Sequence, residues 1–292
     1  GWRISEEPFF ESAKAYVNNF KIRYSYGSLG NQQVSNYYYL DTISTSGMSY
    51  TFDGVNQAFK ATASDPKSSS LTWETVVTNN IGLDMSFLRS RLTFSGDFYI
   101  RDTRNMLTAA MTLPESYGAT EPTENAADLR TIGYELSLGW RDHRMVAGSE
   151  LSYGVSASLG DYKTVITRFE NESKLLSSHY VGETLGEIWG YTTDGLFKTD
   201  EEAAAYMAEI NDKNVSKGIY GGAAPNNVLM AGDLKYKDLN GDKAINSGDN
   251  TLDNPGDRRV IGNSLPRYTY SIKGDLSWYG VDLSIFFQGV GK

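Results

Sequence analysis

The chain has 292 residues and a net charge of −9, from 27 Lys and Arg against 36 Asp and Glu. With this acidic balance and no basic stripe to hold phosphates, nucleic acid is excluded as a partner. The absence of cysteine excludes disulfides and Cys-based metal or thiol sites, and no apolar run approaches the ~20 residues of a membrane helix. The 20 Tyr and 29 Gly, with few segments of helical period, favour an all-β chain.

The N-terminal part carries one clear strand signal. Residues 20–26, FKIRYSY, alternate Phe, Ile and Tyr with Lys, Arg and Ser, and Gly27 is expected to end the strand. Residues 28–70 are rich in Gly, Ser, Asn and Tyr. Weaker patterns there predict strands at 37–43 and near 49–59.

Residues 71–88 predict a long strand, followed by a tight turn at Arg89-Ser90 and a second strand at 92–100. Because strand side chains alternate between faces, this turn brings apolar residues of the two strands opposite each other. The predicted cross-strand pairs are Phe87 with Leu92, Met85 with Phe94, and Ile81 with Phe98.

A polar connection at 102–130 separates this hairpin from two more alternating strands, 132–140 and 151–159, which a shorter link at 141–148 joins. The longest interruption follows at 162–265. It contains one helix signal, TDEE before AAAYMAEI, in which Thr199 is expected to cap the first turn and Glu202 to reach back as in a capping box.

The last segment predicts a hairpin of long strands. Residues 267–278 alternate without a break, Tyr279-Gly280 forms the expected two-residue loop, and the alternation resumes at 281–287. Trp278 and Val281 then lie opposite each other, and the register closes. One face, with Ile272, Leu276, Leu283 and Ile285, suits an apolar medium, and the other suits water.

The gaps between strong strands alternate between short and long from Arg89 onward. Outer-membrane barrels have short periplasmic turns, long extracellular loops and strands of about ten residues with apolar-out, polar-in alternation. Aromatic residues near the strand ends also favour a membrane barrel. Alternation alone does not exclude a soluble β-sandwich, and a soluble extracellular β-rich carbohydrate-binding module remains the alternative.

Several segments, in order along the chain, resemble a SusC/RagA-type TonB-dependent outer-membrane transporter. Gly27, Gly30 and Asn31 resemble a strand-ending turn of that family. The resembling segments are WRISEE with FKIRYSYGSLGNQ, LTWETVVTNNIGLDMSFL with FSGDFYIRDTRNML, TIGYELSLGW, GDLKYKDLNGDKAI, DRRVIGNSLPRYTYSI and VDLSIFFQGVGK. The N-terminal plug, the TonB box and the final barrel strands of the family have no counterpart here. We therefore expect residues 1–292 to be a fragment, part of a single barrel domain.

The resemblance implies the rest of the expected biology. The fold is all-β, an antiparallel transmembrane β-barrel segment with long extracellular loops, 162–265 being the longest, and one short helix in a loop. The expected partners are the lipid bilayer of the outer membrane of a Gram-negative bacterium, a SusD-like surface lipoprotein and, through the missing N-terminal part, the TonB system. The implied substrates are glycan or peptide oligomers.

Residues 238–249 match the pattern of an EF-hand calcium loop. Oxygen ligands at alternate positions of a tight loop can turn toward one cation. The candidate ligands are Asp238, Asn240, Asp242, Ala244 through its carbonyl, Asn246 and Asp249. Lys243 stands where the pattern requires Gly, and an L-residue at a left-handed position costs about 1–2 kcal/mol. The alternative is an Asp/Asn-rich turn held by side-chain-to-backbone hydrogen bonds.

Other polar residues give no sharper site. His143, in the predicted periplasmic turn, and His179, in the long loop, have no catalytic partner at telling spacing, and no nucleophile, P-loop or paired-carboxylate motif occurs, so we expect no enzymatic activity. Loop aromatics are expected to pack the loop or meet a partner, with sugar stacking as the alternative. These are Trp189, Tyr191, Phe197 and Tyr220. The expected polar inner wall includes Asp84, Asp97, Glu135, Glu150, Lys273 and Asp275.

Overall fold

The computed structural model describes residues 1–32, 37, 40–51, 54, 57–64, 67, 71–109, 116, 122–210 and 228–291. The chain divides into two compact units. The first comprises Gly1–Glu170 and Thr269–Gly289, and the second comprises Asn171–Tyr268 and Val290–Lys292.

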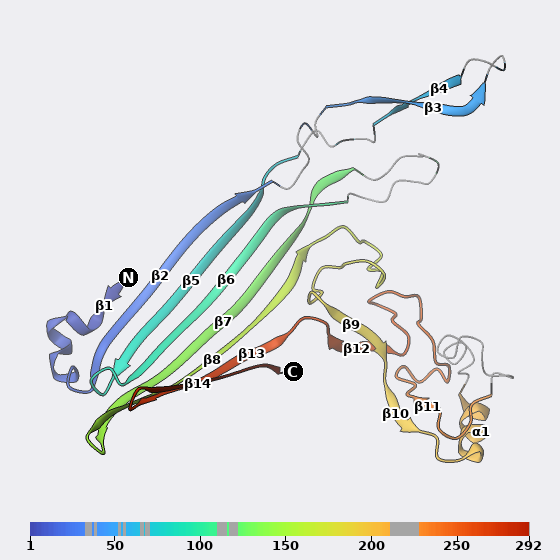
Figure 1. The fold of residues 1–292 in the computed structure, drawn as a ribbon. Helices are drawn as coiled ribbons and strands as arrows, with labels where there is room; N and C mark the ends of the chain where they lie inside the picture. The colour runs from blue at the N-terminus through green and yellow to red at the C-terminus, as the bar shows by residue number, and fades with distance from the viewer. Residues whose placement is uncertain are drawn as a thin grey trace. The chain divides into compact units, whose positions relative to one another are not determined.

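A single antiparallel sheet of long strands forms most of the first unit (Figure 1). Two 3₁₀ helices, η1 (Ile4–Glu6) and η2 (Pro8–Ala13), connect its first two strands. A separate two-stranded sheet pairs β3 (Ile43–Thr51) with β4 (Gln57–Ala63). Across the large sheet the strand order is β1 (Trp2–Arg3), β2 (Val17–Asn31), β5 (Glu74–Phe87), β6 (Leu92–Ala109), β7 (Thr123–Val146), β8 (Ser149–Arg168), β13 (Arg267–Trp278) and β14 (Val281–Gly291).

Three tight turns lie at one end of this sheet, because successive strands run antiparallel. Four residues from Leu88 to Arg91 join β5 to β6, and the pairs Ala147-Gly148 and Tyr279-Gly280 join β7 to β8 and β13 to β14. Both two-residue turns have positive φ at each position, 51° and 81° in the first and 51° and 75° in the second. This geometry matches the twist of the flanking strands, so it holds a hairpin in register.

The cross-strand pairs predicted from the sequence are confirmed. Phe87 lies opposite Leu92, Met85 opposite Phe94 and Ile81 opposite Phe98. The final hairpin also turns at Tyr279-Gly280 as predicted. The period-two pattern therefore determined both the turn positions and the faces of these strands.

The strand ends extend further than predicted. β2 continues past Gly27 to Asn31, because GSLGN pairs with the start of β5. The predicted link at 141–148 is mostly strand, so that His143 lies in β7 opposite Ser152 and not in a turn. β6 and β7 likewise extend into the predicted connection at 102–130, and β8 continues to Arg168.

Two weaker strand predictions are wrong. The segment predicted at 37–43 is strand only from Ile43, with Leu40 in a bend, and residues 38 and 39 lie outside the described part. The strand predicted near 49–59 straddles the connection between β3 and β4, where Gly54 has a φ of 79° that interrupts an extended chain.

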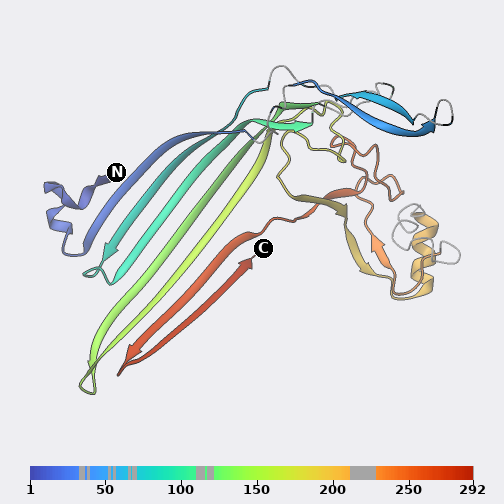
Figure 2. The same cartoon turned by 45° about the horizontal axis from the view of Figure 1, so that its top comes forward.

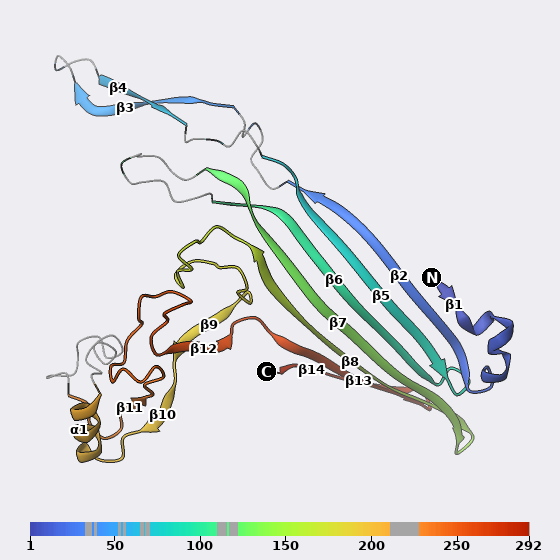
Figure 3. The same cartoon turned by 180° about the vertical axis from the view of Figure 1, so that it is seen from behind.

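The described residues of the second unit form two small antiparallel sheets and one helix. β9 (Glu187–Tyr191) pairs with β12 (Arg258–Asn263), and β10 (Thr193–Leu196) pairs with β11 (Leu234–Tyr236) (Figure 3). Buried Phe197, Ala203 and Leu229 form one small core, and buried Tyr236 and Ile245 form another.

Helix α1 (Asp200–Glu209) has the predicted cap. The Thr199 hydroxyl accepts a hydrogen bond from the Glu202 N–H at 3.2 Å, and the Glu202 carboxylate accepts one from the Lys198 N–H at 2.9 Å. The reach-back therefore goes one residue further than a standard capping box. With Lys235 nearby, this bond from Lys198 lowers the pKa of Glu202. None of the helices in the described ranges is long and apolar enough to cross a membrane.

Candidate functional site

One face of the large sheet is apolar across five strands. Residues directly opposite each other share a face, so each row of cross-strand partners can be followed from strand to strand. One such row consists of Met85, Phe94, Leu138, Ala157 and Ile272. The rows above and below it continue the pattern, with Leu83, Leu136 and Leu159 in the first and Phe87, Trp140 and Val155 in the second.

This apolar face is uncovered. Leu138 and Ile272 are 49% and 48% exposed. Among the described residues of the first unit, the only buried hydrophobic side chains are Ile4, Ala127 and Ile166, none of them in these rows. A soluble sandwich buries one whole face of each sheet against the other. An apolar surface of this extent on a folded chain marks a contact with another apolar phase or partner.

The opposite face is polar and is held by side chains that cross strands. Arg23 on β2 lies opposite Gly82 on β5, which lies opposite Asp97 on β6. The Arg23 guanidinium bonds both oxygens of Asp97, at 3.0 and 2.8 Å, and both oxygens of Asp84, at 2.7 and 3.2 Å. Ser95 donates to Asp84 at 2.9 Å.

Gly82 makes this arrangement possible. A Cβ at position 82 would lie 2.5 Å from Cζ of Arg23, so any larger residue displaces the guanidinium. The same design recurs at Gly133, where a Cβ would lie 2.5 Å from the Tyr99 ring, which extends across it toward Tyr162. Arg101 stacks over Tyr99 at 5.6 Å from the ring centroid. The polar wall is thus built from side chains lying flat across glycines.

A hollow of about 290 Å³ opens on this polar face near the tight-turn end. Gly139 and Gly154, which have no side chain to fill it, lie among its lining residues with Arg91, Arg141 and Asp275. Asp275 bonds Lys273 at 2.8 Å and accepts from the Ser284 hydroxyl at 3.0 Å. Among the lining residues Arg91 and Arg141 are positively charged and Asp275 is negatively charged, so charged side chains of both signs line this hollow.

The candidate calcium loop is held by its own backbone. Asp238 accepts from the N–H groups of Gly241, at 2.7 Å, and Lys243, at 2.9 Å. The carboxylate of buried Asp257 accepts from Leu239 and Asn246. The remaining candidate ligands are also hydrogen-bonded: Asn240 to Asp242, Asp242 to Ala244, Asn246 to Gly248, the Ala244 carbonyl to Asn246, and Asp249 to Asn254.

Lys243 has a φ of 62°, the left-handed conformation predicted for its position in the EF-hand pattern. Desolvation alone would raise the pKa of Asp238, but the N–H groups of Lys243 and Gly241 outweigh it and lower that pKa. The oxygen-rich donor set suits calcium. However, within the described residues no group of three or more His, Cys, Asp or Glu side chains is placed to hold a metal. The loop is therefore a self-supporting turn whose metal binding is still a prediction.

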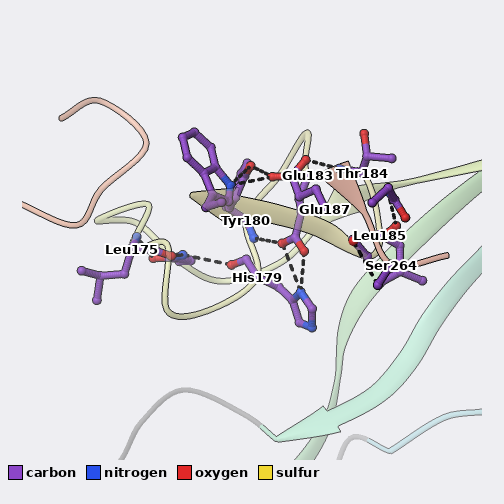
Figure 4. Close-up of polar contacts among 12 residues, drawn as sticks. Leu175, His179, Tyr180, Glu183, Thr184, Leu185, Glu187 and Ser264 are labelled. Atoms are coloured by element: carbon purple, nitrogen blue, oxygen red, sulfur yellow. Dashed lines mark hydrogen bonds and ion pairs between the residues drawn. The ribbon is translucent and has the colours of Figure 1, made fainter. Parts of the chain in front are cut away.

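A second polar network, in the second unit, joins His179 to Glu183 and Trp189 to Glu187, and the sequence did not single out these two carboxylates (Figure 4). Glu183, largely buried, accepts from the Tyr180 N–H at 3.1 Å and contacts Nδ1 of His179 at 3.0 Å. Glu187 accepts from the Tyr180 hydroxyl, from the Thr184 N–H and from Nε1 of Trp189. These bonds fold residues 179–186 into a compact turn that leads into β9. In the sequence, the network shows only as a Glu placed three or four residues after a residue that it bonds: Glu183 follows His179 and Tyr180, and Glu187 follows Thr184.

No family model matches the chain. TonB-dependent receptor P39 of Formosa agariphila is 25% identical over 308 residues, covering 99% of this chain and 28% of the receptor. TonB-dependent receptor SusC of Bacteroides thetaiotaomicron is 29% identical over 143 residues, covering 47% of this chain. The RagAB peptide importer in its open-open state matches 99% of the chain with a TM-score of 0.69 at 19% identity, and the RagAB peptide transporter matches 98% with 0.66 at 18%.

The chain is similar to SusC/RagA-type TonB-dependent receptors. The family resemblance expected from the sequence is confirmed along nearly the whole chain. The chain spans 28% of the length of the first curated relative and 27% of the RagAB chain, so it corresponds to about a quarter of such a receptor.

Within this receptor-like fold, the predicted inner-wall residues share one face of the large sheet. Asp84, Asp97, Glu135, Lys273 and Asp275 belong to the polar face of the sheet. Glu150, which pairs with Met145 next to the Ala147-Gly148 turn, lies on the same polar face, because the register of β7 and β8 is unbroken from there to Glu135 and Gly160.

The loop aromatics of the receptor-like chain pack within the second unit. Trp189 bonds Glu187, the Tyr191 ring contacts that of Tyr236 at 5.7 Å, and Phe197 is buried. Tyr220 lies outside the described residues. Packing is therefore the role that the structure gives to the three described aromatics.

Proposed function

We propose that this chain forms part of the wall of an outer-membrane transporter that takes up nutrient oligomers. The observation that carries the proposal is the continuous, uncovered apolar face of the sheet backed by a polar face. In lipid, only closed hydrogen-bonded structures satisfy every backbone group, and strands with one apolar face meet that requirement once a barrel closes. The likeness to TonB-dependent receptors supports the same conclusion.

The tight-turn end of the sheet is placed in the periplasm by this proposal. Barrels of this kind keep short turns there and long loops outside. Residues 171–266, which belong to the second unit and follow β8 and precede β13 in the sequence, are then extracellular in this proposal. We expect it to meet a SusD-like surface lipoprotein, since a large folded insertion at the outer surface offers an exposed docking face.

Transport energy comes, in this proposal, from the TonB system acting through parts of the receptor outside these residues. In this proposal the polar face either lines the transport path or contacts the plug inside the barrel. The Arg23 ion pairs with Asp84 and Asp97 hold neighbouring strands together. We propose peptide or glycan oligomers as cargo. RagAB is described as a peptide importer, which supports the peptide alternative for this chain.

Calcium binding by the loop at 238–249 is a further part of the proposal. Asp238, Asn240, Asp242, Asn246 and Asp249 would supply side-chain or water-bridged oxygens, and Ala244 its carbonyl. The affinity expected for such an imperfect extracellular loop is about 10⁻⁴–10⁻³ M. Bound calcium would offset repulsion among the Asp side chains and rigidify the turn.

Purification of the full-length receptor from outer membranes, with any co-purifying lipoprotein, tests the uptake proposal. Mass spectrometry of bound oligomers and uptake by cells with and without the gene are the measurements. Loss of growth on a peptide or glycan oligomer upon deletion, restored by the intact gene, is the expected result. A receptor that partitions into the soluble fraction without detergent would contradict the proposal and favour a soluble carbohydrate-binding module.

A further inference from the structure

The chain contains a single Asn-Gly dipeptide, Asn240-Gly241. Both residues are exposed, in the connection from β11 to β12 that is orange in Figure 2. Asparagine is among the thermolabile residues of proteins, because the backbone nitrogen of the next residue attacks its side-chain amide. Glycine hinders this attack least, since it has no Cβ. The dipeptide is therefore a chemically weak point, and the groups around it decide how fast it reacts.

Hydrogen bonds of the loop reach the two atoms that must react with each other. The Gly241 N–H, the attacking group, donates to the Asp238 carboxylate at 2.7 Å. This charge-assisted bond draws the proton from the nitrogen and makes the nitrogen a better nucleophile. Oδ1 of Asn240, on which negative charge develops, accepts from the Asp242 N–H at 3.0 Å. A backbone donor in this position stabilises the oxyanion of a tetrahedral intermediate.

The leaving group and the access of water are also provided for. Nδ2 of Asn240 donates to the Asp242 carboxylate at 3.0 Å, so the side-chain amide is held at both ends by one residue. Holding reacting groups in place lowers the entropic part of a barrier. The described residues leave open space where a Cβ on Gly241 would lie, so water reaches the dipeptide.

We propose that Asn240 is a self-modification site, at which the loop promotes cyclisation of the side chain onto the Gly241 nitrogen. The bond from this nitrogen to Cγ of Asn240 forms and the bond from Cγ to Nδ2 breaks. The Gly241 proton leaves with the side-chain amide as ammonia, and a succinimide remains. Water then adds to one of its two carbonyls and leaves either aspartate or isoaspartate at position 240.

Both products change the candidate calcium loop. Aspartate at position 240 adds a carboxylate beside Asp238 and Asp242, and the number of charged ligands is one of the properties that set calcium affinity. Isoaspartate lengthens the backbone by a methylene before Gly241, which moves the Gly241 and Lys243 N–H groups away from Asp238. The reaction is local to this loop, so the inference does not depend on the proposed function.

Incubation of the purified full-length receptor at neutral pH with a calcium chelator, followed by peptide mass spectrometry, tests the site. Asn246 and Asn263 are internal controls, because each also accepts from the N–H two residues ahead but is followed by serine. We expect the amide-to-acid conversion at position 240 to be at least several-fold faster than at either control. Isoaspartate should appear together with aspartate, because only the succinimide gives both; aspartate alone would overturn the proposal.

The contribution of the loop is measured against the same chain unfolded in urea, which keeps the dipeptide and loses its hydrogen bonds. We expect the folded receptor to react several-fold faster than the unfolded chain. Asp238→Asn should slow the folded receptor several-fold, whereas Asp253→Asn, at an exposed carboxylate bonded to Lys174, should react like the wild type. A folded wild type that reacts no faster than the unfolded chain overturns the proposal, and so does a folded Asp238→Asn that reacts as fast as the wild type. If Asp238→Asn does not fold, the comparison of folded with unfolded wild type decides.

Discussion

Replacing Leu136 by arginine tests the membrane-facing assignment at its most sensitive point. The apolar side chains of β6 run from Leu92 to Ile100, eight residue steps, or about 26 Å along the strand at ~3.3 Å per residue. With the ~40° tilt of membrane strands this is about 20 Å of depth. Leu136 lies in the middle row, opposite Gly96 and Leu159.

Arginine at the bilayer midplane costs about 2–4 kcal/mol on a lipid-facing strand. Since ~1.4 kcal/mol is tenfold, the folded-to-unfolded ratio of Leu136→Arg should fall by roughly 30- to 1,000-fold. Ser137→Arg is the matched control: Ser137 is one residue away, on the polar face between Ser95 and Ser158. A surface substitution of this kind costs within about 0.5 kcal/mol.

The assay is refolding of the full-length receptor into lipid vesicles across a urea titration, with folded fraction as the readout. Both variants share strand, depth and backbone pairing, so the difference reports only the face. Equal midpoints, or a larger loss for Ser137→Arg, would refute the assignment. Leu276→Arg should cost less than Leu136→Arg, because Leu276 lies two residues from the end of β13 at the tight turn, where the penalty falls to about 0–1 kcal/mol.

Further substitutions test individual contacts. Gly82→Ala should lower stability by about 1–3 kcal/mol in the same urea titration, because the new Cβ displaces Arg23 and leaves charged partners unsatisfied; Gly274→Ala, with no atom within 4 Å, is the control and should change nothing. Lys243→Gly should tighten calcium binding by relieving backbone strain and removing a cation, and Asp242→Ala should abolish calcium binding. Calorimetry at millimolar calcium measures both effects. If neither the wild type nor Lys243→Gly gives heat, the loop binds no calcium and is only an Asp-rich turn. Thr199→Ala should cost α1 about 1 kcal/mol, read by hydrogen exchange at the first turn of the helix, and unchanged exchange there would contradict the cap. The Asp238 carboxylate accepts hydrogen bonds from the Gly241 and Lys243 amides, and its pKa is lowered. Protection of these two amides from hydrogen exchange should therefore be full above the ordinary Asp pKa and should be lost as the pH falls through the lowered pKa. Protection from exchange that rises on acidification would contradict this prediction.

The large sheet was predictable because apolar and polar side chains alternate along its strands. Each predicted pair from Ile81 with Phe98 to Phe87 with Leu92 has apolar residues on both strands, so a one-residue slip would have been visible in the sequence. The segments that resemble SusC/RagA-type receptors include these same alternating strands.

The strand ends beyond the apolar rows were not predictable, because both faces are polar there. On β7 and β6, Arg130 bonds Asp102 at 2.7 Å where apolar residues would have marked the face. Similarly, His143 extends β7 without any alternation signal. In the second unit, Asp257 organises a turn through Leu239, 18 residues earlier, and no local pattern reports such a contact.

The glycines of the polar face explain why charged residues alone gave no site. A charged side chain on a strand usually projects away from the sheet. Here Arg23 lies along the wall because Gly82 leaves room, and two carboxylates from different strands hold both edges of its guanidinium. The Arg23 guanidinium therefore links β2 to β5 and β6 through its ion pairs with the two carboxylates. The sequence pairs Arg23 with Gly82 only through the strand register, so the role of either residue becomes readable once the register is known.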